Sequence, residues 1–170
     1  SGAVVGAAHA GWRGLAGQSG VGVLESAMRA LFERFQALAL INKAQAAIEN
    51  VANNAESFET VARGTLAWLG PCIGPQAFEV GPEVREAFCA AGPQYSACFV
   101  PSPTQQGKWL ADLAGLARLR LQAMGVTRIY GNDSSAAWCT VTQSARFFSH
   151  RRDTALLGGS GRLAACIWRG

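Results

Sequence analysis

Short apolar stretches alternate along this chain with longer segments whose apolar residues recur at helical spacing. The run over 3–8 predicts a buried strand that ends in a glycine-rich turn, 9–14. The clearest helix is predicted over 109–124, with Gly125 as its C-cap. Because the alternation contains no internal repeat, it predicts an α/β fold with a mixed sheet or sheets covered by helices.

Glycine and proline mark most of the other expected element ends. A helix is expected from about Val21, a weaker helical stretch over 44–67, and a short helix from Gly81-Pro82 to Gly92-Pro93. The segment 72–80 carries too much turn chemistry for one regular element and predicts a structured loop. The further expected strands are 66–71, 97–100, 127–130, 145–149 and 162–168. The last of these is apolar on both faces, which predicts burial.

Length and composition indicate one globular domain over 1–170. The chain is 49% apolar and 15% charged, which is typical of a folded protein. It contains no uncharged apolar run long enough to span a bilayer, so no membrane association is expected. The opening residues lack the basic start and apolar core of a secretory signal. A cytoplasmic location is therefore expected.

The basic residues favour recognition of small anions over binding of nucleic acid. Lys43 and Lys108 are the only lysines, so 13 of the 15 basic residues are arginine, the residue suited to bidentate phosphate or carboxylate binding. They are scattered and form no basic stripe, which argues against nucleic-acid binding. The five cysteines form no CxxC pair, so neither a disulfide framework nor a structural zinc knuckle is expected.

The chain has two histidines, His9 and His150. His9 follows the predicted strand 3–8 at its carboxyl end, which is where ligands bind in open α/β sheets. A lone histidine in such a place is more often hydrogen-bonded to backbone or solvated, so the surrounding sequence has to decide its role.

Four blocks of sequence give that context. The first is His9-Ala-Gly-Trp-Arg-Gly14 followed by Val-Leu-Glu25, and the second is the stretch 68–84, which begins Trp-Leu-Gly-Pro-Cys-Ile-Gly-Pro. The third is 108–118, and the fourth joins Trp138-Cys-Thr140 to 146–153. In this order, and with the ending Ser-Gly-Arg-Leu-Ala over 160–164, the blocks resemble the C-terminal two-thirds of the YfiH-like polyphenol oxidase/laccase-domain family.

The resemblance implies a YfiH-like layered α/β fold and a zinc-dependent enzyme that acts on purine nucleosides. The implied reactions are phosphorolysis with inorganic phosphate and adenosine deamination. His9 matches one of three zinc ligands, and Arg13 is the best candidate to hold phosphate and assist catalysis. The resemblance also places substrate-binding roles at Arg151, His150, Cys72 and Phe78. The family's older description as a copper polyphenol oxidase is the alternative, but a multicopper site needs many histidines and this chain has two.

The chain departs from the family pattern in two ways. Family members carry a further N-terminal portion with Gln-Val-His-Gly and Thr-Ala-Asp-Cys motifs, which supply the other two zinc ligands, and this sequence begins after both. The connections around 35–64 and 154–159 are longer than is usual. A non-catalytic, partner-dependent fragment therefore stands as a further alternative. Incomplete sheets would expose apolar edges, so we expect a homo-oligomer or pairing with the missing part.

Overall fold

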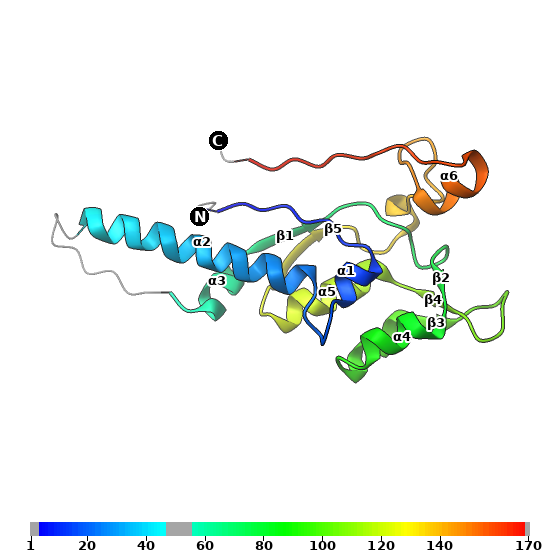
Figure 1. Ribbon diagram of the computed structural model, residues 1–170, viewed down its shortest axis with the longest axis horizontal. Helices are drawn as coiled ribbons and strands as arrows, with labels where there is room; N and C mark the ends of the chain where they lie inside the picture. The colour runs from blue at the N-terminus through cyan, green and yellow to red at the C-terminus, as the bar shows by residue number, and fades with distance from the viewer. Residues whose placement is uncertain (1–3, 47–55, 169–170) are drawn as a thin grey trace.

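The computed structural model describes residues 4–46 and 56–168 (Figure 1). Its helices are α1 (Trp12–Ala16), α2 (Val23–Ala46), α3 (Phe58–Gly64), α4 (Pro82–Cys89), α5 (Leu113–Ala123) and α6 (His150–Leu157), with 3₁₀ turns η1 (Pro93–Cys98) and η2 (Ala136–Trp138). Its strands are β1 (Leu66–Leu69), β2 (Glu79–Val80), β3 (Phe99–Pro101), β4 (Trp109–Ala111) and β5 (Arg128–Gly131). The predicted α/β class is confirmed.

The strands form two small sheets of opposite type. β1 and β5 pair in parallel, with Trp68 opposite Tyr130 and Leu69 opposite Gly131. β4 lies between β2 and β3 in an antiparallel sheet. The chain leaves β1, builds the antiparallel sheet with α4, returns through α5 and closes the parallel pair with β5 (Figure 1). The parallel and antiparallel pairings therefore lie in two separate sheets, and neither sheet contains both kinds of pairing.

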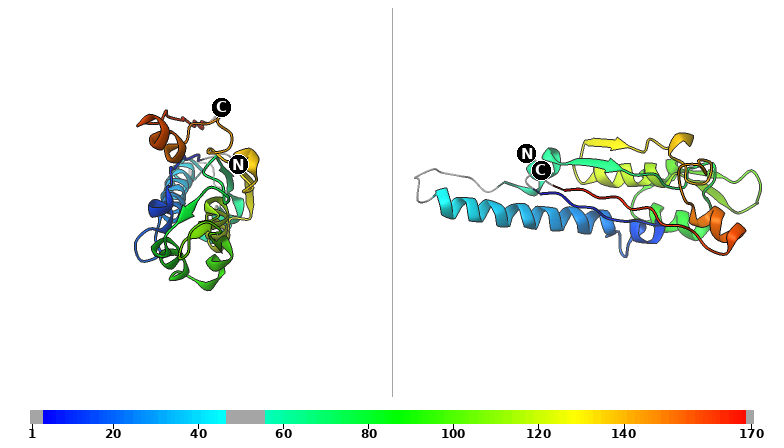
Figure 2. Two further views of the ribbon diagram at one scale, coloured as in Figure 1. Left: turned by 90° about the vertical axis from the view of Figure 1, so that its right-hand side faces the viewer. Right: turned by 90° about the horizontal axis from the view of Figure 1, so that it is seen from above.

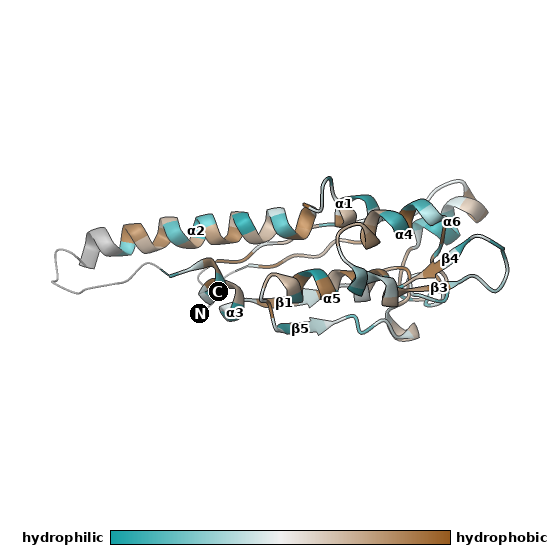
Figure 3. Ribbon diagram, turned by 90° about the horizontal axis from the view of Figure 1, so that it is seen from below, coloured by the Kyte–Doolittle hydropathy of each residue, from teal (hydrophilic) through white to brown (hydrophobic). Residues whose placement is uncertain are grey.

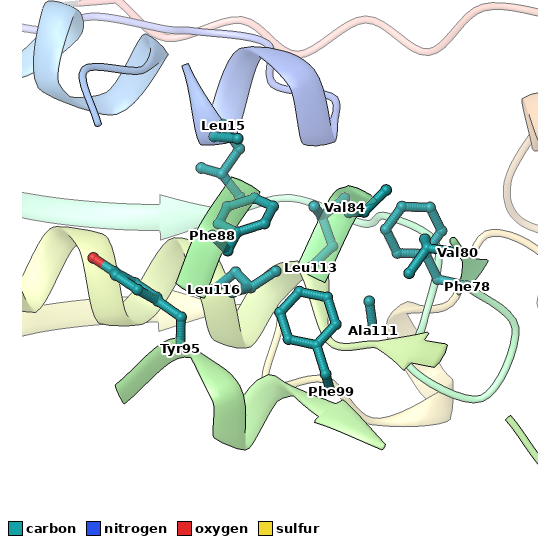
Figure 4. Packing of buried hydrophobic residues seen from close by; sticks show 11 residues of the cluster. Leu15, Phe78, Val80, Val84, Phe88, Tyr95, Phe99, Ala111, Leu113 and Leu116 are labelled. Carbon is teal, nitrogen blue, oxygen red and sulfur yellow. The ribbon is translucent and has the colours of Figure 1, made fainter. Parts of the chain in front are cut away.

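The larger hydrophobic core joins the antiparallel sheet to α1, α4 and α5 (Figure 4). Phe88 on α4 and Leu116 on α5 are 0% exposed. The ring of Phe88 lies 6.4 Å from that of Tyr95 and 6.1 Å from that of Phe99, centroid to centroid. This tilted packing of aromatic rings buries large apolar side chains within the larger core.

A smaller core lies beneath one face of the parallel sheet. Met28 of α2 and Leu121 of α5 are buried there with Ala62 and Val126. Ala67 of β1 and Ile129 of β5 pack against this group. Because strand residues alternate between faces, the neighbouring side chains of β1 and β5 project to the opposite face of the sheet.

The long helix α2 is fixed at its beginning by a buried ion pair. Arg120 of α5 is 2% exposed, and its Nε donates to Glu25 Oε1 at 2.8 Å. Its two terminal nitrogens donate to the backbone carbonyls of Ala16 and Gly20. Glu25 Oε2 in turn accepts from the Gly22 amide at 2.8 Å, which satisfies a free N–H at the helix start.

The molecule is elongated, because α2 extends away from both sheets (Figure 2). Hydrophilic and hydrophobic bands alternate along α2 (Figure 3). The extended segments 4–10 and 160–168 lie along the long axis of the molecule, as α2 does (Figures 1 and 2). None of the helices in 4–46 and 56–168 is both long and apolar enough to cross a membrane.

Several predicted elements are confirmed with shifted ends. The strands expected over 66–71, 97–100 and 127–130 correspond to β1, β3 and β5, and the helix from Gly81-Pro82 is α4. In the expected helical stretch 44–67, α2 continues to Ala46 and α3 begins at Phe58, while residues 47–55 lie outside the described part of the chain. The loop expected over 72–80 is correct except that Glu79 and Val80 form β2.

The helix predicted over 109–124 is confirmed as α5, but it begins at Leu113 and not at Trp109. Residues Trp109–Ala111 form β4, and α5 starts at Leu113. The Asp112 carboxylate accepts from the Gly115 amide at 2.8 Å and so caps the helix. The apolar residues before this cap extend the helical pattern by chance, and their pairing with β2 and β3 places them in the sheet.

Three predicted strands are wrong. No strand forms in the described residues 4–8, at 145–149 or at 162–168. At 145–149 the Ser149 side chain caps α6, and the Ser149 amide donates to Asp153 Oδ2 at 2.8 Å, which commits the segment to a helix start. The expected burial of 162–168 is also wrong, because Leu163 is 51% and Trp168 77% exposed. Neither terminal segment has a strand beside it to complete a ladder among the described residues.

Candidate functional site

Asn132 joins the carboxyl ends of the two parallel strands. It is 2% exposed and follows β5 directly. Its amide donates to Leu69 O at 2.8 Å, and its side-chain Nδ2 donates to Gly70 O at 3.1 Å and to Cys72 Sγ at 3.3 Å. The Ser134 amide donates to its Oδ1 at 2.9 Å. A single buried amide therefore holds the loops that leave β1 and β5.

Arg118 fixes this junction from α5. Its Nη2 and Nε donate to Asn132 O at 2.6 and 3.1 Å, and its Nη1 donates to Ile129 O at 3.2 Å. Gly131 between them has φ 80°, and a Cβ there would lie 2.3 Å from Leu69 O. Only glycine allows β5 to approach β1 this closely at the end of the sheet. The backbone that follows the two strands is therefore held rigidly.

Cys72 and Cys139 lie next to each other beyond this junction. They form an isolated parallel bridge, in which the Thr140 amide donates to Cys72 O at 2.9 Å. The Gly74 amide donates to Cys139 Sγ at 3.2 Å, and a Cβ on Gly74 would be 2.9 Å from that of Cys139. Burial raises the pKa of the Cys72 thiol to about 11, more than the Asn132 hydrogen bond lowers it. Cys72 is therefore a neutral thiol, suited to contact and not to nucleophilic attack.

His9 and Arg13 lie at the start of α1, which packs on the larger core; the turn predicted over 9–14 is wrong from Trp12 on, where α1 begins. Ala10 and Trp12 are half-buried against the same cluster as Cys72, Ile73 and Phe78. His9 and Arg13 are exposed, and the Arg13 guanidinium lies 4.6 Å from the centroid of the Trp12 ring. The described residues give the His9 ring no hydrogen-bond partner. The segment 9–13 therefore exposes an imidazole and a guanidinium to solvent, while Ala10 and Trp12 anchor it to the core.

α6 brings Arg151 to a residue of the same core. The Arg151 guanidinium lies 5.7 Å from the centroid of the Phe78 ring, and its Nη1 donates to Glu79 O at 3.2 Å. Phe78 itself is 5% exposed, so its ring supports Arg151. His150 is exposed, and its Nδ1 lies 3.1 Å from Thr154 Oγ1 one helical turn later.

The arginine next to Arg151 has a structural role. Arg152 donates to the backbone carbonyls of Thr140, Val141 and Phe147 and to Asp153 Oδ1. These bonds attach α6 to the loop that carries Cys139. The hydrogen bond from the Ser149 amide and the pairing with Arg152 hold the pKa of Asp153 below its usual range.

Most of the predicted residues lie in segments that contact the larger core. The segments that carry His9 and Arg13, Cys72 and Phe78 all pack on the larger core, and Arg151 lies on Phe78. Sequence reasoning did not single out Asn132 or Arg118. A polar residue directly after a strand was the available signal for Asn132, but the Gly-Asn-Asp sequence resembled an ordinary turn.

The described residues do not by themselves form a metal centre. A catalytic zinc site needs about three protein ligands and one open position. Within 4–46 and 56–168, no three His, Cys, Asp or Glu side chains lie together as a metal-binding group. His9 is one accessible donor, and Cys72 is held as a protonated thiol.

The chain is similar to proteins that bear the name purine nucleoside phosphorylase. It is 40% identical over 168 residues to a purine nucleoside phosphorylase of Pseudomonas aeruginosa, covering 99% of this chain and 53% of that protein. It is 43% identical over 169 residues to the purine nucleoside phosphorylase YfiH of Escherichia coli, covering 99% of this chain and 52% of that protein. The chain thus spans about half the length of the curated relatives it matches.

Solved structures show the same fold. Protein NMB0706 of Neisseria meningitidis superposes with a TM-score of 0.61 at 37% identity, over 90% of this chain and 47% of that one. YlmD of Geobacillus stearothermophilus superposes with a TM-score of 0.56 at 27% identity, over 90% of this chain and 45% of that one. The YfiH-like resemblance and fold are confirmed. The model of the multi-copper polyphenol oxidoreductase laccase family matches residues 42–170, and the chain belongs to that family.

Proposed function

We propose that this chain carries the phosphate- and nucleoside-binding part of a purine nucleoside phosphorylase. The observation that carries the proposal is its 40% to 43% identity, over 99% of its length, to proteins that bear this name. The chain has two exposed arginines, Arg13 and Arg151, each held over an aromatic ring. A guanidinium fixed in this way loses little side-chain freedom when it binds a phosphate dianion.

Phosphorolysis needs charge stabilisation at two places. A phosphate oxygen attacks C1′ of the ribose, the bond from C1′ to the purine nitrogen breaks, and its electron pair leaves with the purine, which takes up a proton. Arg13 would hold the phosphate in line for attack, and Arg151 with His150 would bind the nucleoside. Phe78 supports Arg151, and the neutral Cys72 thiol would line the same site. Fixed positive groups of this kind stabilise developing negative charge without reorganising.

The same proposal includes the identity of the metal and one of its ligands. Zinc would act as a Lewis acid when bound, with His9 as one ligand and the remaining ligands outside the described residues. Copper is the alternative that the family description suggests. Adenosine deamination is the second activity that the resemblance implies, and a product assay separates it from phosphorolysis, because it releases inosine without consuming phosphate.

The test is product formation from inosine and adenosine, with and without phosphate, in the presence of zinc or copper. We expect release of the free base and ribose 1-phosphate that depends on phosphate. Arg13→Ala should lower the rate about 100-fold, as loss of one charge-stabilising group does elsewhere. Arg63→Ala, at an exposed ion pair with Glu59, is the matched control and should leave the rate unchanged.

Two results would contradict the proposal. One is the absence of base release by the unmodified chain under every metal condition. The other is release that Arg13→Ala leaves at the level of the Arg63→Ala control, since phosphate would then be bound elsewhere. Inosine formation from adenosine without phosphate would replace phosphorolysis with deamination as the reaction.

A further inference from the structure

Two cysteines lie side by side where the segments that follow β1 and η2 meet. Cys72 and Cys139 form an isolated parallel bridge, in which the Thr140 amide donates to Cys72 O at 2.9 Å. Bridge partners on neighbouring strands lie roughly 4.8 Å apart, and their side chains project to the same side. A disulfide accepts Cα separations of about 4.4–6.8 Å. The backbone therefore holds the two residues at a separation that a disulfide spans.

The two sulfurs are free in the structure, and each accepts its own hydrogen bond. Asn132 Nδ2 donates to Cys72 Sγ at 3.3 Å, and the Gly74 amide donates to Cys139 Sγ at 3.2 Å. A Cβ on Gly74 would lie 3.1 Å from Cys139 Sγ, so a glycine two residues after Cys72 leaves the space that this sulfur occupies. Rotation of the two side chains about their Cα–Cβ bonds can exchange these hydrogen bonds for a sulfur–sulfur bond while the backbone bridge stays in place.

The environments of the two thiols differ. Burial raises the pKa of Cys72 to about 11. Burial also acts to raise the pKa of Cys139, but hydrogen bonds to its sulfur, first from Thr142 and then from the Gly74 amide, outweigh it and bring the pKa below 9.0. Cys139 therefore has the larger thiolate fraction of the two and reacts better with an oxidant. Because Cys139 is only 4% exposed, that oxidant has to be small.

We propose that Cys72 and Cys139 form a reversible disulfide in the folded chain when a hydroperoxide is present. The Cys139 thiolate attacks the O–O bond and becomes a sulfenic acid, and the other oxygen leaves as an alcohol or water after it takes up a proton. The Cys72 sulfur then attacks the Cys139 sulfur, and the hydroxyl leaves as water with the thiol proton of Cys72. Two electrons pass from the two thiols to one hydroperoxide, and a dithiol returns them by exchange.

The second step relies on proximity. The neutral Cys72 thiol is a poor nucleophile toward dissolved molecules. The bridge holds it beside Cys139, and a reaction between two groups fixed next to each other needs a far smaller thiolate fraction. The isolated bridge is thus what makes this pair, among the five cysteines, the one expected to close.

The bond would join two segments that carry parts of the candidate site. Cys72 begins the segment that leads to Phe78, and Arg152 attaches α6 to the carbonyls of Thr140 and Val141 just after Cys139. The loop that the bond closes contains the antiparallel sheet, α4 and α5. A crosslink across so long a loop restricts the unfolded chain and stabilises the fold. This inference goes beyond the proposed function, because the disulfide is detected by mass and without turnover.

The fully reduced chain is treated with hydrogen peroxide, once folded and once in urea, and the remaining thiols are then blocked with N-ethylmaleimide in urea. Peptide mapping by mass spectrometry identifies which cysteines are joined. In the folded chain we expect one main crosslink, between the peptides of Cys72 and Cys139, whereas in urea several pairings should form. Dithiothreitol should restore both thiols. The oxidised chain should unfold at a higher urea concentration than the reduced chain.

Three variants separate this pair from general oxidation. Cys139→Ser should lower the yield of disulfides that contain Cys72 at least about tenfold, because it removes the reacting thiolate. Cys72→Ser should prevent the crosslink too, and dimedone should then trap the sulfenic acid on Cys139. Cys98→Ser is the matched control, since burial likewise raises the pKa of Cys98 to about 11. It should change the yield of the crosslink less than about twofold.

Three results would overturn the proposal. The first is the absence of a crosslink between Cys72 and Cys139 in the oxidised folded chain. The second is a main crosslink between other cysteines, such as Cys89 and Cys98. The third is formation of the proposed bond as fast in urea as in the folded chain, since the fold would then contribute nothing. A chain that closes this disulfide but lacks phosphorolysis would leave the inference standing and count against the proposed function alone.

Discussion

The two sheets of this molecule differ in how completely the chain covers them. The antiparallel sheet packs against α1, α4 and α5 with Phe88 and Leu116 fully buried. The parallel sheet has a core on one face, while Leu66, Trp68 and Tyr130 lie open on the other. Local elements complete the first sheet, since α4, β3, β4 and α5 follow one another in sequence. The second sheet has two strands, and the neighbouring strands predicted over 3–8 and 162–168 do not form in the described residues.

The largest expected effect comes from a cavity in the larger hydrophobic core. Phe88→Ala should lower the free energy of unfolding by about 3–5 kcal/mol, because it removes a buried ring and leaves a cavity. Tyr130→Ala, on the exposed face of the parallel sheet, should change the free energy of unfolding by less than about 0.5 kcal/mol. Urea unfolding of both variants measures the difference. Equal losses would mean that the two sheets are equally well packed.

The next effect concerns the buried ion pair that joins α5 to α2. Arg120→Ala leaves Glu25 without its partner and frees the carbonyls of Ala16 and Gly20. We expect a loss of about 2–4 kcal/mol, near the range for breaking a buried pair, since Glu25 keeps some contact with water. The exposed pair of Arg63 and Glu59 is the comparison, and Arg63→Ala should cost less than about 1 kcal/mol. A small loss at Arg120 would show that α2 is held by its apolar contacts alone.

A chemical probe addresses the junction between the two regions. Burial raises the pKa of Cys72 from 9.0 to about 11, so its thiolate fraction at pH 8 should fall about 100-fold on folding. Alkylation by iodoacetamide, followed by mass spectrometry, should be slower in the folded chain by that factor than in urea. Cys166 lies in the exposed segment 160–168 and should react at similar rates in both states. Rapid alkylation of folded Cys72 would show that the strand ends open readily.

The smallest effect is a pH dependence at α6. The Ser149 amide and Arg152 keep the pKa of Asp153 below its ordinary value of 3.8 in the folded chain. A lowered folded pKa means that Asp153 stabilises the fold above pH 3.8 and that this contribution is lost as the pH falls toward the folded value. Urea midpoints at pH 7 and pH 3 should therefore differ less in Asp153→Asn than in the unmodified chain. Glu86→Gln, on the exposed side of α4, should retain the full difference.

Elements fixed by local signals could be predicted from the sequence. Pro82 begins α4, and the short apolar runs form β1 and β5. The strand β4 could not be separated from α5 by periodicity, because three apolar residues fit either period and only the Asp112 cap divides them. The segments 4–8 and 162–168 have strand-like composition. A strand also needs a neighbour, and composition does not report whether one is present.

The site residues also divide into those that local sequence motifs indicate and those that distant contacts define. His9, Arg13 and Arg151 could be proposed from motifs, and the structure places their segments around the larger core. The role of Asn132 depends on contacts to Gly70 and Cys72, which lie 62 and 60 residues away in sequence. No local pattern contains such contacts. Arg118 was also missed, because its acceptors are backbone carbonyls of Ile129, Gly131 and Asn132, and a sequence pattern does not show such contacts.

Hydrogen exchange on the chain alone tests most directly whether one sheet is complete and the other is not. The amides that form the ladder between β1 and β5 should exchange at least about tenfold faster than those of β4 and α5, because they open locally without unfolding the larger core. Exchange of all these amides at one common rate would contradict the central claim, since the parallel sheet would then be as stable as the antiparallel one.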